Sequence, residues 1–145
     1  MQDHAQDSKH KSITLQATIL LLVAGIAQAL SLAWPFEGIF KGEAQGWLQC
    51  VSLGLLAYQL DRSKSGKQAF AKTWVFAFAW LAGSIWWLFI SMHLYGGLPA
   101  PLAGLAVGLM AAGLALFYAT AASVYHAVGK TGVGVLPRAS AFAAV

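Results

Sequence analysis

Long apolar runs separated by short polar segments dominate the pattern along this chain. Four uncharged runs occur, at about residues 13–34, 46–60, 73–95 and 101–128. A helix needs about 20 residues to cross the hydrocarbon core of a bilayer, which is roughly 30 Å thick. The first, third and fourth runs are long enough to cross. The second is short for a full crossing and contains two glutamines and a serine, so an interfacial or re-entrant helix is an alternative there.

Polar or short segments lie at the two ends of the chain. Residues 1–12 are polar and are interpreted as a tail on the cytoplasmic side. Residues 137–145 are interpreted as the start of a fifth helix, which is too short to cross by itself. No repeat or linker divides the chain between them. The pattern therefore predicts an all-α integral membrane protein whose transmembrane region, residues 13–145, has four transmembrane helices plus the start of a fifth.

Basic residues are distributed unevenly between the loops, and this asymmetry predicts the orientation of the helices. If all four runs cross, every Lys and Arg except Lys41 lies on one side of the membrane. Lys and Arg in short loops stay in the cytoplasm. The N-terminus is therefore predicted to be cytoplasmic, with the loops at 35–45 and 95–101 facing outward. A second run that did not cross would move Lys41 into the basic loop and weaken the asymmetry, so four crossings are favoured.

Composition and charge agree with a membrane protein. Apolar residues make up 59% of the chain and charged residues 10%, against about 25% charged in ordinary soluble domains. Basic cytoplasmic loops beside anionic lipid headgroups explain the net charge of +4, and we expect no nucleic-acid partner. A cleaved signal peptide is an alternative for the first run, because Ala27 and Ala29 are small residues suited to cleavage. The run continues to Trp34, which is long for a signal peptide.

Few side chains in the apolar runs could carry chemistry. These runs contain no Asp, Glu, Lys or Arg, the residues that typically mark function inside a membrane. The four histidines are scattered and Cys50 is the one cysteine, so neither a metal site nor an internal disulfide is predicted. Ser91 and His93 are two residues apart and would point to different sides of a helix. We therefore assign no catalytic, cofactor-binding or metal-binding residue.

Small residues in the fourth run form a pattern typical of helix packing. One strip consists of Gly104, Gly108 and Ala112, and a second of Ala111, Ala115 and Ala119. Small residues at intervals of four allow neighbouring helices to approach closely. We expect both strips to contact other helices.

The segment between the third and fourth runs holds the most specific motif. It reads WWLFISMHLYGGLPAP, residues 86–101, and precedes a helix rich in glycine and alanine that contains Tyr118. This arrangement resembles the N-terminal membrane region of the apolipoprotein N-acyltransferases, from about residue 30 to the end of the chain. We take the segment as a candidate lipid-facing or domain-facing loop, with the residues Trp87, Ser91, His93, Tyr95, Gly96, Gly97 and Pro99.

The resemblance implies a bacterial inner-membrane enzyme that transfers an acyl chain from a phospholipid to the N-terminal diacylglyceryl-cysteine of lipoproteins, without a cofactor. Its partners would be the bilayer, the phospholipid donor and the lipoprotein acceptor. Members of the family carry a nitrilase-like domain with a Glu-Lys-Cys triad, and no residue here matches that triad. We therefore expect the N-terminal membrane portion of such an enzyme, inactive alone. The alternative is a small stand-alone four-helix membrane protein, such as a transporter subunit or assembly factor.

Overall fold

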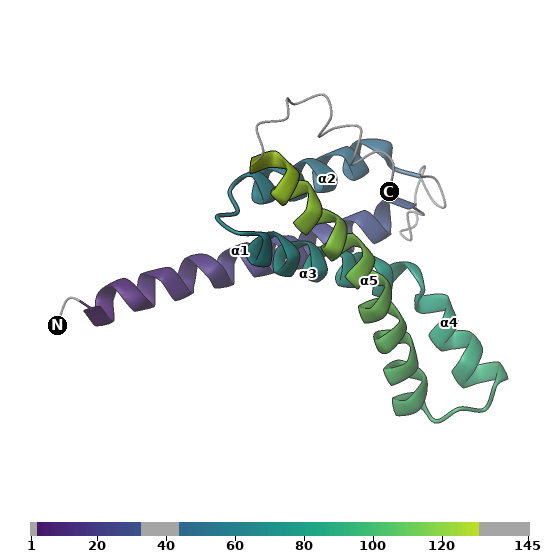
Figure 1. Ribbon diagram of the computed structural model, residues 1–145. Coiled ribbons are helices and arrows are strands. Elements are labelled where there is room, and N and C mark those ends of the chain that lie inside the picture. Colours follow the sequence, from purple (N-terminus) through teal and green to yellow (C-terminus); the bar gives the residue numbers. More distant parts are fainter. Residues whose placement is uncertain (1–2, 33–43, 131–145) are drawn as a thin grey trace.

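The structure, a computed structural model, consists of helices joined by short turns in the part of the chain that it describes. It describes the backbone of residues 3–32 and 44–130 and the side chains of residues 15–32 and 44–127. The elements in order are α1 (Asp3–Leu32), α2 (Gly46–Asp61), α3 (Gly66–Ser84), α4 (Trp86–Ile90), the π-helix η1 (Ser91–Tyr95) and α5 (Ala100–Lys130) (Figure 1). The predicted all-α class is confirmed for these residues.

Two of these helices are long and apolar enough to cross a membrane by themselves. They are α1 over Leu15–Leu32 and α5 over Ala100–Ala127. α3 together with α4 and η1 also qualifies, although the pair is bent by 50°. α2 has 16 residues, about 24 Å at 1.5 Å per residue, which is shorter than the hydrocarbon core. The described chain thus offers two or three candidate spans, and the fifth helix expected at 137–145 lies outside the described residues.

The third apolar run, 73–95, is divided in the structure, because α3 ends at Ser84 and α4 begins at Trp86. The Ser84 hydroxyl donates to the Trp80 carbonyl oxygen at 2.9 Å. A serine bonded in this way often bends a helix, and a Gly-Ser pair is a common position for a sharp kink. Gly83 completes such a pair. The bend carries α4 and η1 alongside the first half of α5 (Figure 1).

α3 also begins earlier than the apolar run, at Gly66, because its first turn is capped. The Ser65 hydroxyl accepts from the Gln68 N–H at 3.3 Å, and the Gln68 side-chain oxygen accepts from the Lys64 N–H at 2.9 Å. This reciprocal pair is a variant of the capping box in which the glutamine binds the N–H one residue before the cap, and it satisfies N–H groups at the start of the helix. The polar residues before position 73 therefore belong to α3.

α3 is the central helix, with α1 on one side and α5 on the other, while α2 packs mainly on α1 (Figure 1). The contact between α1 and α3 is close because small residues meet there. A Cβ added at Gly25 would lie 2.5 Å from the Phe76 carbonyl oxygen, and one added at Gly83 would lie 2.7 Å from Ala29 Cβ. Lipid gives helices no hydrophobic reason to associate, so close packing of this kind is what joins them.

α5 meets α3 through the second of the two predicted strips. The buried residues of α5 are Ala103, Val107, Ala111, Ala115, Ala119 and Ala122. Gly104 is exposed, and a Cβ at Gly108 would have no described heavy atom within 4 Å. Ala112 is half-buried, and its carbonyl oxygen accepts from Trp74 Nε1 at 3.3 Å. A packing role for the strip of Gly104, Gly108 and Ala112 stays a prediction.

A buried polar contact joins α1 and α2. Gln28 is 1% exposed, and its side-chain oxygen accepts from the Ser52 hydroxyl at 2.5 Å. The Ser31 hydroxyl donates to the Gln28 carbonyl oxygen at 2.7 Å. Polar side chains inside a membrane bundle pair in this way because lipid offers them no other partner. Ser52 of α2 therefore faces α1.

Candidate functional site

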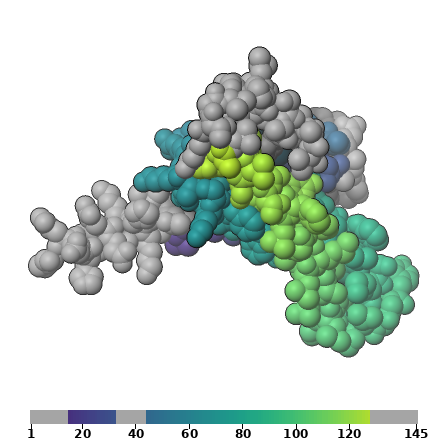
Figure 2. Space-filling view, in the orientation of Figure 1, coloured from purple at the N-terminus to yellow at the C-terminus, as the bar shows by residue number. Residues whose placement is uncertain are grey.

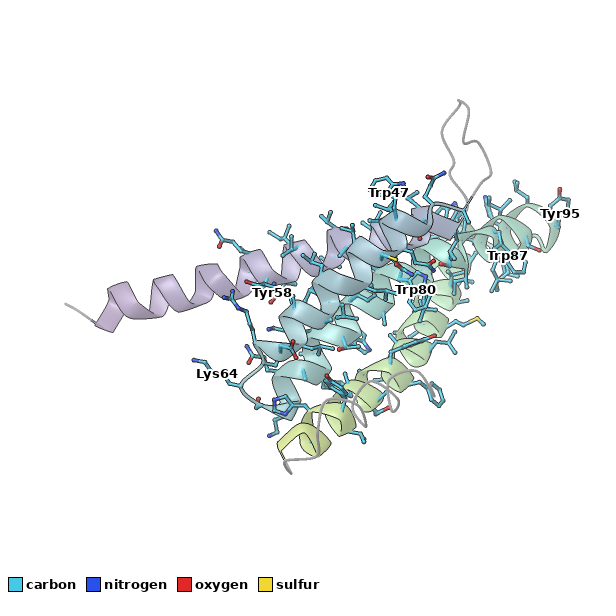
Figure 3. All side chains as sticks on the ribbon, turned by 90° about the horizontal axis from the view of Figure 1, so that it is seen from above. Trp47, Tyr58, Lys64, Trp80, Trp87 and Tyr95 are labelled. Atoms are coloured by element: carbon cyan, nitrogen blue, oxygen red, sulfur yellow. The ribbon has the colours of Figure 1, made fainter. Side chains whose placement is uncertain are left out.

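The candidate loop forms the tip of a hairpin. α4 and η1 run away from the other helices, the chain turns after Tyr95, and α5 returns beside them (Figure 1). Figure 2 shows this hairpin protruding from the rest of the described residues. Trp87 is exposed, and Tyr95, at the tip, is 88% exposed (Figure 3). Tryptophan and tyrosine at such a position are typical of the border between lipid and water.

Two adjacent glycines make the turn, and each is needed for a different reason. Gly97 has a φ of +66°, in the left-handed region that side chains resist. Gly96 has an ordinary φ of −85°, but a Cβ there would lie 2.7 Å from the Met92 carbonyl oxygen. The turn is closed by bonds from the Gly96 N–H to the Ser91 oxygen and from the Leu98 N–H to the Met92 oxygen, both 3.1 Å. The close approach at Gly96 carries no sequence signal, because the carbonyl group that it meets is a backbone group.

His93 fastens this turn to the helix that precedes it. Its Nδ1 lies 2.8 Å from the Leu98 carbonyl oxygen. A carbonyl oxygen can only accept, so Nδ1 donates this hydrogen bond. The ring also stacks on Phe89 at 5.7 Å, and Phe89 stacks on Trp86 at 4.7 Å. In the part of the chain that the structure describes, no hydrogen bond joins His93 to Ser91, in keeping with the spacing of the two residues.

Pro99 marks the start of the returning helix. Its carbonyl oxygen accepts from the N–H groups of Leu102 and Ala103, at 2.9 and 3.1 Å. Pro101 follows within the first turn of α5. Prolines are tolerated there because the first N–H groups of a helix have no partner within it. The hairpin thus combines a proline-marked entry to α5 with a turn that favours glycine.

A second fixed turn joins α2 to α3 at the opposite end of the bundle from the hairpin tip (Figure 3). His126 of α5 has its Nε2 2.9 Å from the Ser63 carbonyl oxygen. The Ser123 hydroxyl donates to the Gly66 carbonyl oxygen at 3.4 Å. No sequence signal indicates these bonds, because their acceptors are backbone groups that any residue supplies.

Among the described residues the hairpin offers an exposed surface for contact. No group of three or more His, Cys, Asp or Glu in those residues could hold a metal ion. Cys50 is exposed on α2, and α2 packs on α1 and α3. What the site presents is a set of aromatic side chains, a backbone turn and one imidazole nitrogen.

Comparison with known proteins identifies relatives over most of the chain. Residues 27–145 match the family described as apolipoprotein N-acyltransferase N-terminal domain. The apolipoprotein N-acyltransferase of Verminephrobacter eiseniae is 52% identical over 108 residues, 72% of this chain and 19% of the relative. That of Pseudomonas syringae pv. tomato is 35% identical over 128 residues, 88% of this chain and 23% of the relative. The chain thus spans about a fifth of the length of these relatives. No solved structure matches it.

Proposed function

The chain belongs to the apolipoprotein N-acyltransferase family through its N-terminal domain, and we propose that it forms the N-terminal membrane portion of such an enzyme. The complete enzyme would transfer an acyl chain from a phospholipid to the N-terminal diacylglyceryl-cysteine of a lipoprotein. One observation carries the proposal: the stretch with the family motif, 86–101, is built as a separate, exposed hairpin with aromatic residues at its tip. Residues 1–145 alone would not catalyse the transfer.

The proposed placement is the bacterial inner membrane, with four crossings and a cytoplasmic N-terminus. The distribution of Lys and Arg supports it, since four crossings place every Lys and Arg except Lys41 on the cytoplasmic side. The surface of α2 supports it too. An interfacial helix has one strongly polar face in contact with water, whereas α2 turns Ser52 toward α1 and exposes Val51 and Leu53. A short crossing helix is accommodated by local thinning of the bilayer and by flanking side chains that reach the interface.

Single cysteines test this topology. Cys50→Ala removes the one cysteine, and cysteines are then placed at three exposed positions, Ala44, Lys64 and Tyr95. A maleimide that cannot cross membranes should label Ala44→Cys and Tyr95→Cys in intact cells, and Lys64→Cys only after lysis. Labelling of Ala44→Cys and Lys64→Cys from the same side would show that α2 does not cross. Labelling of Lys64→Cys alone in intact cells would show that the protein has the opposite orientation in the membrane.

A chimera tests the function. Residues 1–145 replace the corresponding N-terminal part of the Verminephrobacter eiseniae enzyme, and the product is assayed in lipid with labelled phospholipid and a diacylated acceptor peptide. We expect the chimera to form a labelled triacylated peptide and residues 1–145 alone to form none. Transfer by residues 1–145 alone would contradict the proposal, and so would an inactive chimera that is inserted and folded.

The hairpin is tested within the same chimera. Tyr95→Ala should lower transfer, because it removes the most exposed aromatic side chain of the tip. Phe117→Ala is the matched control, since Phe117 is an exposed aromatic residue on α5 outside the motif. Equal activity of the two variants would show that the hairpin is only a connector.

A further inference from the structure

The face of α2 that points away from the other helices carries a surface that is separate from the hairpin. Residues 47, 51, 54, 58 and 62 recur at intervals of three and four and therefore share one face of the helix. Trp47, Val51 and Tyr58 are each more than half exposed. The opposite face, with Ser52, Leu56 and Leu60, is buried. We call this surface the outer stripe of α2: Trp47, Val51, Gly54, Tyr58 and Arg62.

Gly54 leaves a bare section of helix in the middle of the stripe. A Cβ at this position would have no described heavy atom within 4 Å. Val51 and Tyr58 stand about one turn away on either side. An apolar chain could therefore lie against the backbone of α2 here without displacing a side chain.

The stripe ends in positive charge at the turn between α2 and α3. The Arg62 guanidinium lies 4.6 Å from the centroid of the Tyr58 ring, and this cation–π contact holds it at the end of the stripe. Lys64 and Lys67 follow and are exposed, while Asp61 is the one acidic residue of the turn. Figure 3 shows Trp47 near one end of α2, Tyr58 near the other and Lys64 beyond it.

The turn that carries these charges is held in place. The capping box fixes the backbone at Lys64 through Gln68, and His126 binds the Ser63 carbonyl oxygen. The Lys72 ammonium group is already engaged, since it donates to the Gln59 carbonyl oxygen at 2.7 Å. Arg62 and Lys64 are therefore the cations left at the end of the stripe to meet an anion, with Lys67 nearby.

We propose that the outer stripe of α2 binds an anionic phospholipid of the cytoplasmic leaflet, with its phosphate at Arg62 and Lys64 and an acyl chain along the bare surface at Gly54. Arginine suits a phosphate because its guanidinium donates two parallel hydrogen bonds. Gly54 and Arg62 are about 12 Å apart along the axis, within the roughly 15 Å depth of hydrocarbon in one leaflet. The proposal rests on the proposed crossing of α2, and the lipid is distinct from an acyl donor at the outward hairpin.

Native mass spectrometry of the full chain in detergent tests the headgroup, with phosphatidylglycerol or phosphatidylcholine added. Phosphatidylglycerol should be retained preferentially. Removing charge with Arg62→Gln and Lys64→Gln should weaken its retention by about fivefold per charge. The control is Lys9→Gln with Lys11→Gln, which removes the same charge on the same predicted side and should leave retention unchanged. Equal retention of the two lipids, or an equal effect of the control, would overturn the proposal.

A second variant tests the acyl chain. Gly54→Leu fills the bare section and should lower retention of phosphatidylglycerol. The same change improves helix propensity, so the unfolding temperature should stay the same or rise, and lost binding cannot then be assigned to misfolding. Unchanged retention would exclude the stripe as the lipid site. The readout does not use acyl transfer, so an inactive chimera with intact lipid selectivity would count against the proposed function alone.

Discussion

Gly25 of α1 lies in close contact with α3, and Gly25→Ala should weaken that contact. The new Cβ would lie 2.5 Å from the Phe76 carbonyl oxygen and 2.8 Å from Ala79 Cβ. Non-bonded heavy atoms rest at about 3.5 Å, so the helices would have to separate locally by about 1 Å. Rotation of a side chain cannot relieve the overlap, because one obstacle is backbone and the other is a Cβ.

The loss of stability can be worked out from the packing contacts that this separation of α1 and α3 would loosen. Leu21, Ala24 and Phe76 are all buried beside the contact. A gap of about 0.5 to 1 Å forfeits roughly a quarter to a half of the dispersion energy of a contact, and overpacking a core typically costs about 1 to 3 kcal/mol. The higher helix propensity of alanine offsets at most about 1 kcal/mol. We expect a net loss of about 1 to 2 kcal/mol in the free energy of unfolding.

Unfolding of the purified protein in mixed micelles, titrated with a denaturing detergent and followed by circular dichroism, measures this quantity. Gly113→Ala is the matched control, because a Cβ at Gly113 would have no described heavy atom within 4 Å. It should leave the free energy of unfolding unchanged or raise it by up to about 1 kcal/mol. If both variants change it equally, or if Gly25→Ala stabilises the protein, the packing argument is refuted.

Three further changes test the hairpin and the buried polar contact. Gly97→Ala should destabilise by about 1 kcal/mol, measured as above, and Gly97→Asn by less, because asparagine tolerates a positive φ; equal losses would contradict this. His93→Phe keeps a ring to stack but loses the bond to Leu98, so hydrogen exchange of the turn amides should speed up; unchanged exchange would show that the bond does not hold the turn. A double-mutant cycle of Gln28→Leu and Ser52→Ala should give a coupling of about 0.6 kcal/mol. A coupling of zero would show that this contact contributes nothing.

The helical class could be predicted from the sequence because an uncharged run in lipid must satisfy its backbone within the same segment. The bend between α3 and α4 could not. Gly83 and Ser84 also fit a straight helix, and the reason for a glycine at 83 is Ala29, which lies in a different helix. The start of α3 was missed for another reason: hydropathy ends the run at 73, whereas the Ser65 cap allows polar residues to continue the helix.

The motif predicted a loop between the third and fourth apolar runs, and the details of its turn depended on atoms that carry no sequence signal. A π-helix shifts the backbone bonds by one residue without a characteristic composition. His93 binds a backbone carbonyl, which every residue has. The outer stripe of α2 lies between these cases. The spacing of its residues is present in the sequence. That this face points away from the other helices follows only from the contact of Ser52 with α1.

In the segment from α3 to η1, α3 packs closely on its neighbouring helices and α4 and η1 do not. α3 meets α1 and α5 through small residues whose backbones approach closely. Beyond Ile85 the nearest described atom to a Cβ at Gly104 of α5 is a Phe89 ring carbon at 3.9 Å, so rings rather than backbones make that contact. Segments with fewer buried contacts open at lower free energy than the core. α4 and η1 have no buried residues, so the hairpin that carries the family motif should open at lower free energy than α3, which has five.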